Sequence, residues 1–147
     1  RDAFDAHLAR AATLDRGPAL AEYERALAIY RGELYENDAF QWAEPVRHDY
    51  HTRYVQAARR AGQLALDCRD TERAIDFFRR VTDREPIDEE AARSLMLAFA
   101  ARADLNGVRK VYKGLCEALR RELEDEAARP LPDTEDLFER LTEPGKH

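Results

Sequence analysis

Hydrophobic residues recur at intervals of three and four along almost the whole chain, which predicts amphipathic helices. No stretch alternates between apolar and polar residues as a strand bounded by hairpin turns would. A first helix that carries Phe4 and Leu8 should end near Arg16 and Gly17, and Pro18 should open a second helix. We therefore predict an all-α fold of about seven helices.

Further start and stop signals divide the rest of the chain. The periodicity lapses between Arg31 and about Phe40, which predicts a structured connection. Trp42 and Pro45 then precede the longest expected helix, which stops near Arg69. Later helices should begin after aspartates whose carboxylates can accept hydrogen bonds from the free amides of a first helical turn. These predicted caps are Asp70, Asp88, Asp104 and Asp133, and residues 143–147 are expected to form a frayed tail.

Pairs of similar residues are separated by 34 positions, which is the tetratricopeptide period. The pairs are Leu64 and Ala98, Asp70 and Asp104, Ala74 and Val108, Phe78 and Tyr112, and Val81 and Leu115. We therefore predict tetratricopeptide-like antiparallel helix pairs in a right-handed stack, forming a single domain over residues 1–142. The N-terminal helices continue this register only with an insertion of about 20 residues between Tyr30 and Tyr50.

The insertion and several later segments together resemble a known family. The stretch from Leu27 to Leu34, followed by Phe40 and Trp42 and later by residues 86–96 and 130–137, resembles the bacterial transcriptional activation domain of Streptomyces antibiotic regulatory protein-type regulators. The resemblance implies a regulatory module for dimerisation, partner contact or control of the DNA-binding half. It also implies a winged helix-turn-helix DNA-binding domain outside this chain. The family usually has a glycine soon after the last repeat helix, whereas residues 124–129 of this chain read EDEAAR.

The charge balance argues against direct contact with DNA. The 147 residues carry a formal net charge of -6, and the basic residues occur as scattered pairs separated by acids. Duplex-binding domains usually concentrate basic residues on one face, so we expect no measurable duplex affinity at moderate salt. The expected partner is a protein: the regulator's own DNA-binding domain, a second copy in a homodimer, or the transcription machinery.

The sequence offers little for catalysis or cofactor binding. Ser94 is the only serine, and no nucleophile elbow, phosphate-binding loop or zinc-protease motif occurs, so we predict no enzyme and no cofactor. Glu44, His48 and His51 have a helical spacing compatible with a metal, but without further ligands the simpler interpretation is an exposed helix face. The absence of a long apolar run and of a disulfide framework favours a cytoplasmic protein without membrane contact.

Two sets of residues are candidates for binding. The first helix of each tetratricopeptide unit lines the concave surface of such a stack, so its outward positions can face a partner. For units that start at Val55 and Glu89, these positions are Gln56, Arg59, Gln63, Glu90, Arg93 and Leu97, and the alternative interpretation is a solvated polar face. Phe40 and Trp42 either anchor the insertion on the helical core or line a small-molecule pocket. The alternative functions are therefore a general adaptor or scaffold and a small-molecule-sensing helical domain.

Overall fold

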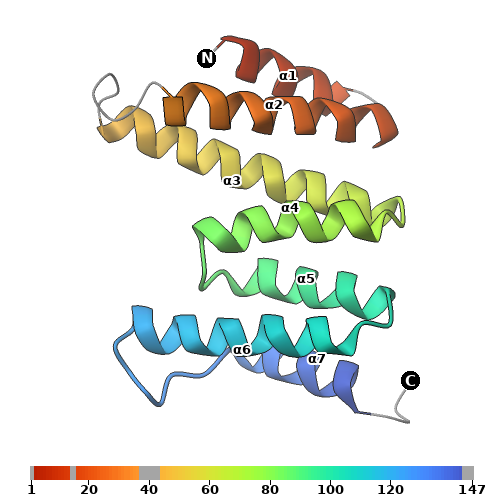
Figure 1. The fold of residues 1–147 in the computed structure, drawn as a ribbon, viewed down its shortest axis with the longest axis vertical. Helices are drawn as coiled ribbons and strands as arrows, with labels where there is room; N and C mark the ends of the chain where they lie inside the picture. Colours follow the sequence, from red (N-terminus) through yellow and green to blue (C-terminus); the bar gives the residue numbers. More distant parts are fainter. Residues whose placement is uncertain (1, 14–15, 37–43, 144–147) are drawn as a thin grey trace. The chain divides into compact units, whose positions relative to one another are not determined.

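The computed structural model describes residues 2–13, 16–36 and 44–143, with side chains described for residues 3–10, 18–28 and 49–143. Over these residues the chain forms seven helices and no strand, which confirms the predicted all-α class (Figure 1). The chain divides into two compact units, residues 1–69 and 70–147. The single domain over residues 1–142 stays a prediction. The helices are α1 Asp2–Thr13, α2 Arg16–Glu36 and α3 Glu44–Asp67 in the first unit, and α4 Thr71–Arg84, α5 Glu89–Ala101, α6 Leu105–Glu122 and α7 Pro132–Thr142 in the second.

In the first unit, α2 packs against both α1 and α3. Phe4 of α1 is fully buried, and its ring centroid lies 5.6 Å from that of Tyr50 on α3. The guanidinium of Arg53 lies over both rings, 5.3 Å from the Phe4 centroid and 5.7 Å from the Tyr50 centroid, and it pairs with Asp5. This aromatic and ionic contact holds α1 to α3 as well as to α2.

Two predicted boundaries in the first unit were wrong. Helix α1 ends at Thr13, and α2 begins at Arg16, two residues before Pro18. The helix tolerates Pro18 in its first turn because the amides there have no partner within the helix. Helix α2 also continues through Gly32 to Glu36, where a connection was predicted. One glycine costs a helix only about 1 kcal/mol, and its neighbours form helices well. The rest of that predicted connection, residues 37–43, lies outside the described residues.

In the second unit, α5 packs against α4 and α6, while α7 packs against α5 and α6. Consecutive helices of this unit run in opposite directions, so α4 and α6 point the same way (Figure 1). Helix α5 contributes much of the core through its small and large apolar side chains. Its buried residues are Ala91, Ala92, Leu95, Met96, Ala98 and Phe99. Among the described residues, no helix has both the length and the apolar character needed to cross a membrane.

Aspartate caps start three helices, as the sequence predicts. Asp70, Asp88 and Asp104 accept hydrogen bonds from the backbone amides of Arg73, Ala91 and Gly107, respectively. The residues before the first and third caps, Arg69 and Ala103, both adopt positive φ angles, of 62° and 57°. The same turn therefore recurs at the tetratricopeptide period, down to its backbone conformation.

The predicted cap of the last helix was wrong. Asp133 lies within the first turn of α7 and is not its cap. The N-cap residue is Leu131, whose side chain makes no capping hydrogen bond. Glu89 of α5 instead accepts hydrogen bonds from the Leu131 amide at 2.8 Å and from the Thr134 hydroxyl at 2.7 Å. The carboxylate at the start of α7 thus comes from a different helix, so a local sequence pattern cannot identify it.

The two glycines of α6 occupy different environments. A Cβ at Gly107 would lie 2.3–2.8 Å from ring atoms of Phe99 on α5, so the close approach of the two helices requires glycine there. At Gly114, two turns later, an added Cβ would meet no atom within 4 Å, and the residue is exposed. Packing within the described chain therefore explains Gly107 but not Gly114.

Alanine at these two glycines should change stability in opposite directions. We expect Gly107→Ala to lower the free energy of unfolding by roughly 1–3 kcal/mol, because the added methyl overlaps the Phe99 ring. Gly114→Ala should raise it by roughly 0.5–1 kcal/mol, because alanine is the better helix former at an exposed position. Urea unfolding followed by circular dichroism measures both changes. Similar losses in the two variants would contradict the packing described for Gly107.

Candidate functional site

Three of the six residues predicted to face a partner lie on α3 in the first unit. Gln56 and Gln63 are exposed, and Arg59 is half-buried. The side-chain amide of Gln63 donates a hydrogen bond to Asp67 at 3.1 Å, one helical turn further on. These residues share one side of α3, as their spacing predicts. Partner binding by them stays a prediction.

The other three residues of the predicted face lie on α5 in the second unit. Glu90 and Leu97 are exposed, and Leu97 keeps 45% of its surface accessible. Arg93 is half-buried and donates a hydrogen bond to the Thr134 hydroxyl of α7 at 2.9 Å. Helix α7 therefore occupies part of this face of α5, and Arg93 already has an intramolecular partner.

The predicted insertion anchors, Phe40 and Trp42, lie outside the described residues, so the pocket proposed beside Trp42 stays a prediction. The side chains of Glu44 and His48, two of the three residues considered for a metal, lie outside them as well. Within the part of the chain that the structure describes, no three His, Cys, Asp or Glu side chains are grouped to hold a metal ion.

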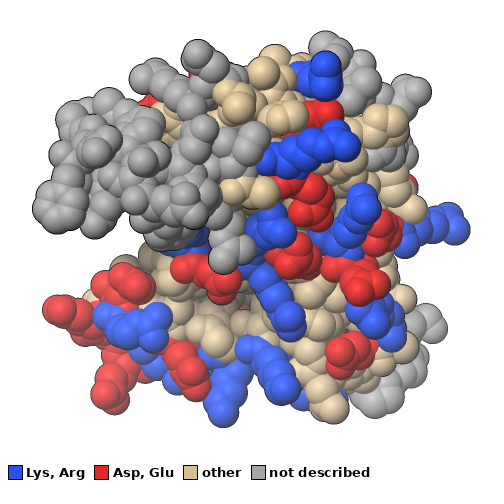
Figure 2. All heavy atoms as spheres, turned by 45° about the horizontal axis from the view of Figure 1, so that its top comes forward, with Lys and Arg blue, Asp and Glu red and all other residues tan. Residues whose placement is uncertain are grey.

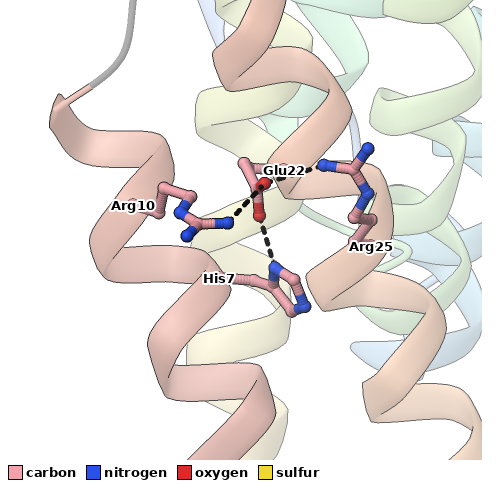
Figure 3. A network of polar contacts seen from close by, with 4 residues as sticks. All are labelled: His7, Arg10, Glu22 and Arg25. Atoms are coloured by element: carbon pink, nitrogen blue, oxygen red, sulfur yellow. Dashed lines mark hydrogen bonds and ion pairs between the residues drawn. The ribbon is translucent and has the colours of Figure 1, made fainter.

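A buried carboxylate joins α1 to α2 in the first unit (Figure 3). The side chain of Glu22 keeps only 5% of its surface accessible. His7 of α1 contacts the Oε2 atom of Glu22 through its Nδ1 atom. Arg25 donates to Oε1 at 2.7 Å, and Arg10 lies at 3.5 Å from the same oxygen. Two helices thus direct three basic side chains at one acid.

The network favours the ionised form of Glu22. The hydrogen bond with His7 lowers the pKa of Glu22 below its ordinary value, and the charges of Arg25 and Arg10 add to this effect, while burial opposes it. A carboxylate whose pKa is depressed by folding stabilises the fold above its unfolded pKa. This stabilisation is lost as the pH falls through the folded pKa. The arrangement therefore fastens α1 to α2 at neutral pH.

A groove crosses one face of the second unit. Helices α4 and α6 form its sides, and α5 forms its floor. It consists of two adjoining hollows of about 220 and 350 Å³, both of which are lined by Thr82, Leu95, Lys110 and Val111. The groove is therefore built from all three helices, within a single unit.

The groove has an apolar floor and charged edges. Leu95 and Phe99 of α5 are buried beneath it, and the guanidinium of Arg79 lies over the Phe99 ring, 5.3 Å from its centroid. Lys110 and Arg121 of α6 are exposed at the opposite edge, and neither forms an ion pair with any described residue. Such a surface can bury apolar groups at its centre while pairing with charges at its border.

The groove and the predicted partner face lie on opposite sides of α5. Residues 92, 95 and 99 face the groove, whereas residues 90, 93 and 97 form the predicted face. Successive residues of a helix are rotated by about 100° around its axis. The mean directions of the two sets of side chains therefore lie roughly 160° apart around α5. Sequence reasoning missed the groove because its floor consists of ordinary core residues. The exposed Gly114 on its α6 side was a signal that could have found it.

Helix pairs with a 34-residue period are typical of helical-repeat modules, whose extended surfaces bind other molecules. The sequence matches the family described as the bacterial transcriptional activator domain over residues 2–141, and the chain belongs to this family. The match confirms the resemblance seen in the sequence, and it makes the chain a regulatory module of the transcriptional activator type. Comparison with curated proteins and with solved structures gave no match.

Acid should destabilise the chain partly through Glu22. The free energy of unfolding should fall as the pH drops below the ordinary glutamate range, because protonation removes the pairing of Glu22 with its three basic partners. Glu22→Gln should be less stable at neutral pH and should lose part of this pH dependence. Urea titrations followed by circular dichroism, from neutral pH to about pH 3, measure both effects. Glu117→Gln, at an exposed position of α6, is the control and should keep the native dependence; the same dependence in Glu22→Gln would contradict the role of the network.

Proposed function

We propose that this chain is the protein-contact module of a bacterial transcription regulator and that its partner docks in the groove of the second unit. DNA binding then resides in a winged helix-turn-helix domain outside these residues. The observation that carries the proposal is the groove itself, with an apolar floor on α5 and unpaired basic side chains on α6. Membership of the activator domain family supports a role in transcription.

The distribution of charge supports a protein partner over DNA. Lysine and arginine side chains lie beside aspartate and glutamate side chains over much of the visible described surface (Figure 2), and the chain has a formal net charge of -6. Duplex binding draws on many basic contacts with phosphates. Burial of apolar surface, in contrast, drives association between proteins, and the lining of the groove includes the half-buried Val111 beside the buried Leu95 and Phe99.

The face predicted from the sequence is a second candidate docking surface. Its supporting observation is Leu97, a large apolar side chain that is 45% exposed one helical turn beyond Arg93. Gln56, Arg59 and Gln63 on α3 were predicted from the sequence on the same grounds. This face is the weaker candidate because single exposed apolar residues are common on protein surfaces and because Arg93 is already hydrogen-bonded to Thr134.

A tethering assay tests the proposed function. The chain is fused to an unrelated DNA-binding domain whose site lies upstream of a weak bacterial reporter promoter. We expect transcription to rise several-fold over the DNA-binding domain alone, and the rise to shrink in Lys110→Glu/Arg121→Glu. Arg109→Glu/Arg120→Glu is the matched control, since it makes the same charge change on the same helix outside the two hollows.

The unfused chain is examined in parallel for duplex binding by fluorescence anisotropy, and no binding is expected at moderate salt. Two results would contradict the proposed function: a tethered chain that leaves transcription unchanged, or specific, salt-resistant duplex binding by the chain alone.

A further inference from the structure

We propose that the occupant of the groove is an acidic amphipathic α-helix of another protein. Its apolar face would lie on Leu95, Phe99 and Val111, and its carboxylates would pair with Lys110 and Arg121. This inference rests on the proposed function and deepens it, because it names the chemistry of the partner.

Next to Gly114 the groove contains space that no atom of the described chain fills. Gly114 lies in the middle of α6, where glycine costs roughly 1 kcal/mol of stability relative to alanine. It lines the groove, and an added Cβ would meet no atom within 4 Å. Without a side chain at this point, the backbone of a docked segment can approach α6 closely. A helix that crosses α6 at Gly114 would use this space.

The charges at the α6 edge select an acidic partner. Lys110 and Arg121 stand on either side of Gly114, about three helical turns apart, or roughly 16 Å along the axis. The acidic residues of the lining are Asp83 and Asp104, and the carboxylate of Asp104 already caps α6. The net charge of -6 opposes acidic partners at long range, but salt screens charges beyond about 8 Å at physiological ionic strength. Local pairs at the groove edge therefore set the preference.

The shape of the groove favours a helix over an extended peptide. Its sides are two helices that run in the same direction with α5 between them (Figure 1). The described residues include no strand whose free edge an extended peptide could join. An amphipathic helix, in contrast, inserts side chains at three- and four-residue intervals into a groove between helices.

The second unit already holds one acidic helix on α5 and α6, namely its own α7. This helix carries acidic residues in its first turn, buries Leu137, and stacks the ring of Phe138 on that of Tyr112 at 3.9 Å. Tyr112 also donates a hydrogen bond to Glu135 at 2.6 Å. Because α7 is packed in this way, a second copy of the chain could offer its own α7 to the groove only after that helix had left its α5 and α6. This favours a different protein as the occupant.

Synthetic helical peptides test the chemistry directly by fluorescence anisotropy with the full chain. The first peptide has leucines along one face and glutamates beside them, the second has lysine in place of each glutamate, and the third has glutamine in place of each leucine. We expect saturable binding of the first peptide, and weaker binding of the other two. Binding that is no tighter for the first peptide than for the second would overturn the proposal.

Variants of the chain locate the binding site. Lys110→Glu/Arg121→Glu should weaken binding of the acidic peptide roughly tenfold, because two exposed attractive pairs become repulsive, and should strengthen binding of the basic peptide. Arg109→Glu/Arg120→Glu should leave both affinities close to native. Gly114→Leu should block the acidic peptide while circular dichroism shows a helical content at least equal to native. An unchanged affinity in Gly114→Leu would overturn the placement in the groove.

Two further outcomes would assign the groove to another occupant and overturn the proposal. One is self-association of the native chain in analytical ultracentrifugation that Lys110→Glu/Arg121→Glu abolishes, since the occupant would then be a second copy. The other is displacement of the acidic peptide by duplex DNA.

Failure of this inference can be distinguished from failure of the proposed function. A tethered chain that activates transcription and loses this activity on charge reversal, but binds the acidic peptide no tighter than the basic one, contradicts only the inference. An inactive tethered chain that binds the acidic peptide contradicts only the function.

Discussion

Helix α5 carries a broad apolar face, and the second unit is organised by the need to cover it. Its buried residues span nearly half of the helix circumference, at about 100° per residue. Helices α4 and α6 flank one part of this face, and α7 is fixed beside another part by Glu89 and Arg93. Gly107 sets how closely α6 approaches Phe99. The groove is the space that α4 and α6 leave between them above α5.

Much of this fold could be predicted because its determinants are local. An aspartate followed by an amphipathic stretch located three helix starts, at Asp70, Asp88 and Asp104. The prediction failed at α7, where Glu89 supplies the carboxylate from 42 residues away along the chain. It also failed at Gly32, since a single glycine is a weak breaker within a long helix.

The functional surfaces were harder to predict than the helices. A glutamate in an amphipathic helix is normally exposed, so nothing in the sequence separates Glu22 from its exposed counterparts until His7 and Arg10 are placed beside it. The floor of the groove has the same difficulty, because Leu95 and Phe99 follow the periodicity of any core residue. The predicted partner face relied on tetratricopeptide geometry, which indicates the concave side of a stack but not a groove on the opposite side of α5.

The two units differ in the kind of contacts that their side chains make. In the first unit, buried ionic and aromatic contacts hold α1 against α2 and α3. The second unit has a groove that is lined by apolar side chains and bordered by unpaired basic groups. The chain belongs to the activator domain family, and the proposed protein contact is placed at this groove.

The most direct measurement is an NMR titration of the ¹⁵N-labelled chain with the acidic amphipathic peptide, which reports the contact residue by residue. The account predicts that backbone amide shifts concentrate at Thr82, Lys110, Val111 and Gly114, while Glu90 and Leu97 on the opposite side of α5 stay unchanged. Shifts centred on Glu90 and Leu97, with the groove residues unaffected, would contradict it.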